Sequence, residues 1–433
     1  MSDLTSQFLP YIQNYRIPGL FLGNDLVHPI YNGRSILNIP STICHTFGIP
    51  DLGAPPLDQE LLEQIDNYCD TRDVQRIIFI LMDGLSLIRL RNWMDGGQLP
   101  IFSELVQNGS LIPLTSIVPS TTSSALSSLW TGRSPAEHGI VGYEMWMKEY
   151  GMVVNTIVQA PMSYKNDFGS LVKAGFIPEE FIPFTTLGTH LAKHQVRSYA
   201  FQHYSISRSG LSKMLFKDTA NQPFNTATDL WLNILQLIEN KPYERMFIWV
   251  YWGELDYFSH HYGPNDSRVQ IEFTNFLHTL QQSLIMPLKQ NAKGKTLLLL
   301  AADHGEIATQ KNPQFELRNH PSLTKRLHIM PTGENRLAFL YIRPGQIENV
   351  CSYIEQTWGN QFSIIKSQQA AKAGLFGQGQ QHPRLFDRLG EYTIIAHDDA
   401  YLWWADKDNH LFGRHGGMSP DEMLVPFFTM LLP

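Results

Sequence analysis

Long apolar runs that end near an acidic residue recur three times along the chain. The run "RIIFILM" leads into Asp83, "RMFIWVYWGEL" leads into Asp256, and "KTLLLLAA" leads into Asp303. Segments with helical periodicity, such as "ATDLWLNILQLIEN" and "VQIEFTNFLHTLQQSL", stand between these runs. Unbroken apolar strands that alternate with helices are typical of a parallel sheet that is covered on both faces. The pattern therefore predicts an α/β fold, with a mostly parallel central sheet and helices on both of its faces.

Two parts of the chain depart from this alternation. Residues 1–56 are rich in Pro, Gly and Asn, which predicts an irregular N-terminal arm. From about 306 to 391 the apolar pattern loosens, although "RLAFLYIRPG" predicts a strand and "IENVCSYIEQTW" predicts a helix. We therefore expect residues 1–433 to form a single catalytic domain, with an arm at 1–56 and a smaller cap-like insertion at about 306–391.

A segment rich in hydroxyl groups, "VPSTTSSALSSLWTG", spans residues 118–132. Its apolar residues recur at helical spacing, and Gly132 stands where a helix commonly ends. Thr121 or Thr122 would then lie at the helix N-terminus, where free N–H groups and the helix dipole favour an anion. Local sequence alone favours a simple capping role for either threonine. Beside bound metal ions, the same hydroxyl group can ionise and attack phosphorus.

Carboxylates and imidazoles gather in four short motifs, "FILMDG", "ELDYFSHHYGP", "AADHGE" and "GRHGG". In the second motif, Asp256 and His260 are four residues apart, so they would share one face of a helix. Taken singly, each motif is more typical of a cap, a turn or a surface contact. Together the motifs supply Asp83, Asp256, His260, Asp303, His304 and His415.

Three carboxylates and three imidazoles are suitable donors for two zinc ions with three protein ligands each. Other divalent metals can use the same donors. Two divalent ions carry +4 and three carboxylates carry −3, so the expected site has a charge of about +1. A locally positive centre in a chain with a formal charge of −7 suits a phosphate group.

The composition is that of an ordinary globular enzyme, with 43% hydrophobic and 17% charged residues. The net charge of −7 argues against a nucleic-acid-binding surface. The N-terminal residues do not predict a secretory signal, and the absence of an apolar run of about 18 residues predicts that the chain does not cross a membrane. The 3 cysteines are far apart and predict reduced thiols, so we expect a cytoplasmic protein. The sequence makes no prediction of the oligomeric state.

The order of the motifs resembles that of a known group of enzymes. "LMDG", "PSTTSSALSSLWTGRSPAEHGI", "ELDYFSHHYGP", "ADHGE" and "RHGG" resemble the motifs of the alkaline phosphatase superfamily. Within it, "TGRSPAEHGI" and the D-x-x-x-H-x-x-G-P block are most similar to the type I phosphodiesterase/nucleotide pyrophosphatase family. The motifs run from Asp83 to His415, so the resemblance covers most of the chain and implies an alkaline phosphatase-like fold.

The resemblance also implies a role for each matching residue. One zinc ion would be held by Asp83, Thr122, Asp303 and His304, and the other by Asp256, His260 and His415. The spacing to "TG" at 131–132 makes Thr122 the nucleophile, and the backbone N–H of Ser123 would donate to the phosphoryl oxygens. In such enzymes the threonine displaces an alcohol from phosphorus, and water then hydrolyses the phospho-threonine ester.

The sequence departs from the family pattern near the nucleophile. Where members that cleave nucleotides carry Phe-Pro-Asn, "SSA" follows Thr122. Tyr143 stands where an Asn usually contacts a phosphoryl oxygen, and two interpretations stay open. Either the hydroxyl of Tyr143 donates in its place, or the neighbouring Glu144 alters the pocket. The sulfatase motif C-x-P-x-R is absent, which argues against a sulfatase.

The main expectation is a two-zinc hydrolase that cleaves phosphodiester or nucleotide pyrophosphate bonds in a small phosphorylated substrate, with a nucleotide as one candidate. A phosphomonoesterase or phosphonate hydrolase is the alternative, and it would need further cations, for which Arg133, Lys148 and Lys165 are candidates. A phosphomutase and a non-catalytic metal-binding protein are two weaker alternatives.

Overall fold

A seven-stranded sheet forms the centre of the computed structural model, which describes residues 2–163, 170–291 and 294–432. The strand order is β2-β16-β9-β1-β8-β6-β7. The strands are β1 (Arg76–Met82), β2 (Ser110–Thr115), β6 (Arg197–His203), β7 (Thr219–Phe224), β8 (Met246–Trp252), β9 (Thr296–Ala301) and β16 (Leu424–Leu432). β1 pairs in parallel with β8 and β9, whereas β16 is antiparallel to both β2 and β9. The predicted mostly parallel central sheet is confirmed.

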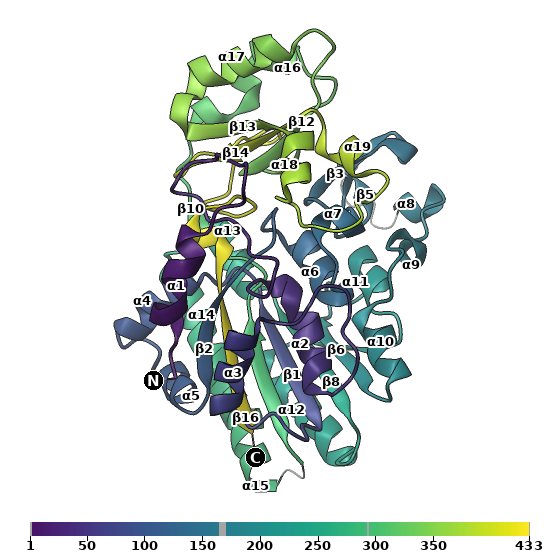
Figure 1. Ribbon diagram of the computed structural model, residues 1–433, viewed down its shortest axis with the longest axis vertical. Helices are drawn as coiled ribbons and strands as arrows, with labels where there is room; N and C mark the ends of the chain where they lie inside the picture. The colour runs from purple at the N-terminus through teal and green to yellow at the C-terminus, as the bar shows by residue number, and fades with distance from the viewer. Residues whose placement is uncertain (1, 164–169, 292–293, 433) are drawn as a thin grey trace.

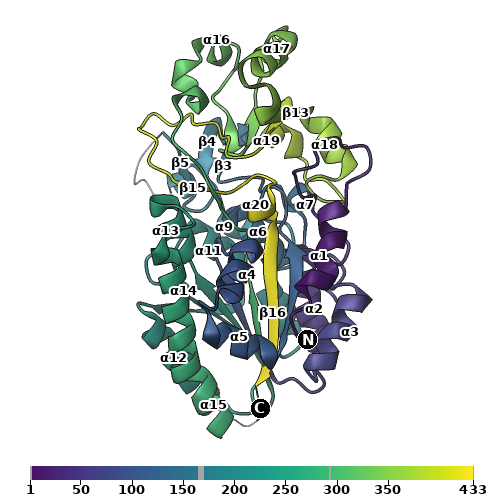
Figure 2. The same ribbon diagram turned by 90° about the vertical axis from the view of Figure 1, so that its left-hand side faces the viewer.

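Helices cover both faces of this sheet (Figure 2). α12 (Ala227–Asn240) and α14 (Ser267–Leu280) pack on one face, and α2 (Ile39–Thr46) and α3 (Gln59–Tyr68) pack on the other. All residues of β1 and β9 are buried, because both faces of the sheet are covered. This burial explains why these strands read as continuous apolar runs rather than as alternating ones. Further helices around the central sheet are α1 (Thr5–Asn14), α4 (Leu87–Asp95), α5 (Pro100–Gln107), α10 (Leu187–Lys193) and α11 (Gly210–Leu215).

A second sheet, which we call the cap sheet, lies beyond the carboxyl ends of the central strands (Figure 1). Its order is β13-β14-β12-β11-β3-β4-β5, and its paired strands are antiparallel. Its strands are β3 (Glu144–Met147), β4 (Met152–Asn155), β5 (Ala160–Pro161), β11 (Thr332–Glu334), β12 (Leu337–Leu340), β13 (Phe362–Lys366) and β14 (Tyr392–Ala396).

The cap sheet is assembled from two distant segments of the chain. β11, β12, β13 and α17 (Ile347–Trp358) lie within the insertion expected at about 306–391, and β14 follows it directly. β3, β4 and β5 come from 144–161, where the sequence suggested no cap. The segments join where Gly333 of β11 pairs with Glu144 of β3. A side chain on Gly142 would lie 2.6 Å from the Cα of Gly333, so this junction needs a glycine.

The N-terminal arm contacts both sheets. The N–H of Leu4 donates to the carbonyl of Leu111 in β2 at 2.9 Å. Farther along the arm, Asp25 lies 2.7 Å from His397, whose other ring nitrogen lies 2.8 Å from Ser363 of β13. The arm therefore links an edge strand of the central sheet to the edge of the cap sheet.

Two expectations from composition can be compared with the structure. Cys44, Cys69 and Cys351 are free thiols, as predicted. In the described ranges, no helix combines the length and the apolar character that crossing a bilayer requires. The cytoplasmic location stays a prediction.

Candidate active site

The candidate ligands meet where the central strands β9, β1 and β8 end. Asp83 follows β1 directly, Asp303 lies two residues after β9, and Asp256 lies in the first turn of α13 (Glu254–Tyr262), which follows β8. Because these three strands are parallel neighbours, their carboxyl ends share one edge of the sheet. Two groups of ligand atoms result, each within 4.8 Å of one another. The first group is Asp83, Asp303 and His304, and the second is Asp256, His260, Glu306 and His415.

The hydroxyl-rich segment forms the buried helix α6 (Thr122–Thr131), as its apolar spacing predicted. The helix ends at Gly132, whose φ of 62° is a left-handed conformation that favours glycine. The Thr122 Oγ1 atom lies 3.3 Å from Nε2 of His304. The hydroxyl of Thr121 instead donates to Glu334 at 2.6 Å. The two adjacent threonines therefore have different surroundings, and Thr122 is the one beside the ligand groups.

The three histidines direct the same ring nitrogen toward the ligand groups. Each Nδ1 faces a backbone carbonyl, which can only accept, so Nδ1 is the donor in each ring and Nε2 is the nitrogen that a neutral ring would offer to a metal. The pairs are His260 with Gly413 at 2.9 Å, His304 with Gly305 at 3.1 Å and His415 with Ser120 at 3.1 Å. A carbonyl that fixes the far nitrogen in this way is the usual support of a metal-binding histidine. Burial, and then the His304 imidazole, lowers the pKa of His415 and keeps it neutral.

Buried carboxylate oxygens without a hydrogen-bond partner are concentrated in these groups. Among the described residues they include Asp83 Oδ1, Asp256 Oδ1, Asp303 Oδ2 and both carboxylate oxygens of Glu306. Burial and then neighbouring carboxylates raise the pKa values of Asp83 and Glu306, and burial raises that of Asp303. Buried, unpaired carboxylates are costly unless a cation is bound. The residues present therefore fit divalent metal ions.

Sequence reasoning missed two residues of this centre. Glu306, the last residue of "AADHGE", is fully buried and its Oε1 lies 3.6 Å from Nε2 of His260. It is a fourth carboxylate, so two divalent ions would meet four negative charges, and the expected charge of about +1 becomes about 0. Tyr251 of β8 donates a hydrogen bond to Asp83. The Glu at the end of "ADHGE" was a signal for the first, whereas the apolar strand around Tyr251 gave none.

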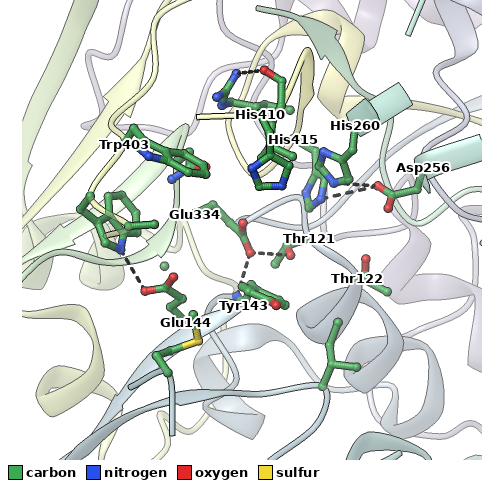
Figure 3. Close-up of a pocket in the computed structure, with 18 of the residues that line it drawn as sticks. Thr121, Thr122, Tyr143, Glu144, Asp256, His260, Glu334, Trp403, His410 and His415 are labelled. Carbon is green, nitrogen blue, oxygen red and sulfur yellow. Dashed lines mark hydrogen bonds and ion pairs between the residues drawn. The ribbon is translucent and has the colours of Figure 1, made fainter. Parts of the chain in front are cut away.

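A cavity of about 370 Å³ opens beside Thr122 and extends under the cap sheet (Figure 3). Asp256, His260 and His415 of the second ligand group line it, together with Tyr143, Glu144, Glu334, Trp403 and Trp404. Burial raises the pKa of Glu144 to about 7 and that of Glu334 to about 8. The Tyr143 side chain reaches the same cavity as Thr122, and burial raises the pKa of its hydroxyl. Its contact with a phosphoryl group stays a prediction.

The other residues that the sequence predicted as phosphate contacts are Ser123 and three cations, and they do not all lie at the cavity. Ser123 is buried in the first turn of α6, where N–H groups lack a partner within the helix, and its proposed N–H contact stays a prediction. Arg133 pairs with Glu137 at 3.1 Å and Lys148 pairs with Asp387 at 3.0 Å, away from the cavity. Lys165 lies outside the described residues. Among the described residues, the Lys and Arg side chains at the cavity wall are Lys407 and Arg414.

The sequence profile of the type I phosphodiesterase/nucleotide pyrophosphatase family matches residues 77–418. The chain belongs to this family. The match contains every candidate ligand from Asp83 to His415, and membership in the type I phosphodiesterase family indicates a phosphoester hydrolase.

Solved structures show the same fold as this type I phosphodiesterase. Mouse ectonucleotide pyrophosphatase/phosphodiesterase 5 matches with a TM-score of 0.59 and 18% identity over 82% of this chain and 88% of that one. An inactive variant of the mouse protein in complex with AMP matches with a TM-score of 0.60, at the same identity and coverage. Phosphonoacetate hydrolase from Sinorhizobium meliloti 1021, in complex with phosphonoformate, matches with a TM-score of 0.59 and 16% identity over 82% and 90% of the two chains. These likenesses confirm the alkaline phosphatase-like fold.

Proposed function

We propose that this protein is a two-metal phosphodiesterase that uses Thr122 as its nucleophile. The observation that carries the proposal is the position of the Thr122 hydroxyl, 3.3 Å from His304 Nε2 at the start of α6. There it lies at the positive end of a helix and beside two groups of metal-binding side chains. A hydroxyl in such surroundings is suited to attack phosphorus.

The two ligand groups would each hold one divalent ion, and we propose zinc because the donors are nitrogen and oxygen. The first ion would be held by Asp83, Thr122, Asp303 and His304, and the second by Asp256, His260, His415 and Glu306. When bound, the ions would lower the pKa of the Thr122 hydroxyl and offset negative charge on the phosphoryl oxygens.

The protein's own groups account for the two chemical steps. The Thr122 hydroxyl gives up its proton and Oγ1 forms a bond to phosphorus while the bond from phosphorus to the departing oxygen breaks. The departing oxygen takes up a proton and leaves as the alcohol, and a phospho-threonine ester remains. Water then attacks the same phosphorus and releases Thr122. The first-turn N–H groups of α6, that of Ser123 among them, would donate to the phosphoryl oxygens in both steps.

The charge of the centre supports a diester over a monoester. With four carboxylates and two divalent ions the centre is about neutral, and a diester brings one negative charge where a monoester brings two. Arg133 and Lys148 are engaged elsewhere. A nucleotide pyrophosphate is a further candidate substrate, because AMP is bound in the mouse relative. A monoesterase or phosphonate hydrolase is the second candidate function, which Lys407 and Arg414 at the cavity wall favour.

Hydrolysis of bis-p-nitrophenyl phosphate tests the proposal. We expect zinc-loaded wild-type protein to hydrolyse it, and Thr122→Ala to lose about three orders of magnitude or more in kcat/KM, because nucleophile and metal act together. Ser124→Ala is the matched control, since its hydroxyl lies on the same helix turn and has no hydrogen-bond partner among the described residues. Activity that survives both Thr122→Ala and metal removal would contradict the mechanism.

A second assay separates the two candidate functions. We expect kcat/KM for bis-p-nitrophenyl phosphate to exceed that for p-nitrophenyl phosphate, because the dianionic monoester meets an uncompensated charge. The reverse order, measured on the same zinc-loaded preparation, would favour the monoesterase.

A further inference from the structure

The candidate ligand His415 is followed by a pair of glycines, and the second glycine touches a buried carboxyl group. A side chain on Gly417 would lie 2.8 Å from Oε2 of Glu422, so the loop passes close to this carboxyl group. Glu422 lies in α20 (Pro420–Met423), the short helix before β16, and is fully buried. It belongs to neither ligand group, and the proposed mechanism gives it no role.

The carboxyl group of Glu422 binds the segment that follows His415. Its Oε1 accepts from the N–H of Gly417 at 2.8 Å, and its Oε2 accepts from the N–H of Ser419 at 3.1 Å and from the hydroxyl of Ser419 at 2.7 Å. The contacts to Ser419 form a capping box at the start of α20. The bond to Gly417 lies outside this box and only two residues from His415. It therefore restrains the backbone that carries the candidate ligand.

The main chain of the same residue contacts the other segment that carries candidate ligands. The carbonyl of Glu422 accepts from the N–H of Gly305 at 2.8 Å. Gly305 stands between His304 of the first ligand group and Glu306 of the second. Glu422 thus contacts both ligand segments, and only its contact with the His415 segment depends on the carboxyl group.

An arginine of the cap sheet pairs with Glu422. Arg336 lies in the turn between β11 and β12, its Nε lies 2.9 Å from Oε1 of Glu422, and both side chains are fully buried. Two residues earlier, Glu334 packs so closely against the loop that a side chain on Gly416 would overlap it. A buried ion pair is stable when hydrogen bonds support it, whereas removal of one partner leaves an uncompensated charge. The cap therefore contributes to the position of the loop that carries His415.

We propose that Glu422 is a positioning residue of the second ligand group, which holds His415 in place before a metal ion binds, and that Arg336 of the cap holds Glu422 in turn. This inference rests on the proposed two-metal function and adds a residue that acts through a ligand. The Nδ1 of His415 faces the carbonyl of Ser120 at 3.1 Å, which fixes the rotation of the ring. Glu422 restrains the main chain, and Nε2 of the ring lies 3.7 Å from Asp256. Ligands that are already in place lose less conformational entropy when a metal binds.

A second capping box of the same pattern supplies a matched control. The sequence "SPAE" at 134–137 repeats the pattern of "SPDE" at 419–422. Oε2 of Glu137 accepts from the N–H and from the hydroxyl of Ser134, each at 2.9 Å, and its Oε1 lies 3.1 Å from Arg133. None of these three residues belongs to a ligand group. Glu137→Gln therefore changes the same kind of box, with the same kind of arginine partner, away from the candidate metal ligands.

Competition for zinc with a chelator tests the proposal. In Glu422→Gln we expect zinc affinity at the second site to fall by about 10- to 100-fold, as is typical when a partner of a metal ligand is lost. Glu137→Gln should bind zinc like the wild type. In a His260→Ala background, which should keep only the first site, Glu422→Gln should cause no further loss. Wild-type affinity in Glu422→Gln, or equal losses in Glu422→Gln and Glu137→Gln, would overturn the inference.

Variants of the arginine and excess zinc separate positioning from a general loss of structure. Arg336→Gln should lower second-site zinc affinity as Glu422→Gln does, and Arg336→Lys, which keeps the charge, should restore part of it. In Glu422→Gln, zinc in excess of the weakened affinity should restore most of kcat for bis-p-nitrophenyl phosphate. Activity that no zinc concentration restores would show a structural role and overturn the assignment.

Hydrogen exchange in the metal-free wild-type protein covers the case of variants that do not fold. Because Glu422 should hold the loop without a metal ion, we expect the amides of Gly417 and Ser419 to exchange at least about a hundredfold more slowly than in an unfolded chain. Protection that appears only after zinc is added would mean that the ion orders the loop, and would overturn the inference. Zinc affinity that falls in Glu422→Gln as expected, in a protein that hydrolyses no diester, would overturn the proposed function and leave this inference intact.

Discussion

The central sheet and the cap sheet contribute different kinds of side chain to the same candidate site. The edge of the central sheet brings together the candidate metal-binding groups, from strands that are adjacent and parallel. The cap sheet brings Glu144 and Glu334 together from segments about 190 residues apart, and places both on the wall of the cavity. We therefore propose that the side chains at the strand ends carry out the chemistry, and that the cap contributes to the choice of substrate. Substitutions in the central-sheet residues and in the cap-sheet residues should therefore have separable effects.

The largest effect is expected from the central-sheet side. His260→Ala removes a ligand whose Nε2 faces Asp256 and Glu306, so the second ion should be lost and kcat/KM should fall by about three orders of magnitude. Metal analysis should then find about one ion per chain instead of about two. His261→Ala is the matched control, because this neighbour on α13 is exposed and bonds to the carbonyl of Tyr257. Equal losses in the two variants would contradict the assigned ligand set.

Glu306→Gln tests the residue that sequence reasoning missed. Because Gln keeps the shape but not the charge, we expect zinc affinity at the second site to fall by about 10- to 100-fold, measured by competition with a chelator. Glu334→Gln, the corresponding change on the cap side, should leave zinc affinity unchanged. If both variants bind zinc like the wild type, Glu306 is not a ligand.

In metal-free protein, the raised pKa values of Glu144 and Glu334 should contribute to the pH dependence of the free energy of unfolding. The pKa of Glu144 is raised to about 7 and that of Glu334 to about 8, so between about pH 4.5 and 8 the folded state holds more protons than the unfolded state. The free energy of unfolding should therefore fall as pH rises through this range, by several kcal/mol at about 1.4 kcal/mol per pKa unit, and level off above it.

Denaturant unfolding of chelator-treated protein at several pH values measures this slope. The Glu144→Gln/Glu334→Gln variant should show a smaller slope than the wild type, because neither amide titrates. A slope of the opposite sign in the wild type would contradict the environment described for these two groups.

The smallest effect is expected from the threonine that faces the cap. Thr121→Val removes the hydrogen bond to Glu334 and leaves Thr122 in place, so kcat/KM should fall by about tenfold or less, equivalent to about 1.4 kcal/mol or less. Thr122→Val should cost at least about a hundredfold more. Comparable losses in the two variants would remove the distinction between the adjacent threonines.

The central-sheet half of the site was largely predictable from sequence. Asp83, Asp256 and Asp303 each follow an apolar run, and parallel strands place such residues at one edge. The buried helix at 122–131 was also predictable, because apolar spacing and Gly132 are local signals. Edge strand β7 was not, because its residues are mostly exposed and carry no apolar run.

The cap half depended on contacts that no local pattern records. Glu144 and Glu334 come close together because β3 pairs with β11. The two strands are far apart in the sequence, and no local sequence pattern predicts that they pair. The spacing after "HGI" made Tyr143 a candidate contact, and its side chain lines the same cavity as Thr122, but the bond from its backbone N–H to Glu334 was not predicted. Long-range register of this kind follows from tertiary packing rather than from local sequence preference.

The central claim is that the phosphoryl group of the substrate is transferred to the Thr122 hydroxyl before water releases it. The most direct test is rapid acid quenching of the zinc-loaded enzyme during diester turnover, followed by mass spectrometry of the peptide that contains residues 118–132. The account predicts a phosphoryl ester on Thr122 in the wild type and none in Thr122→Ala. Turnover without any adduct at this position, together with wild-type activity in Thr122→Ala, would contradict it.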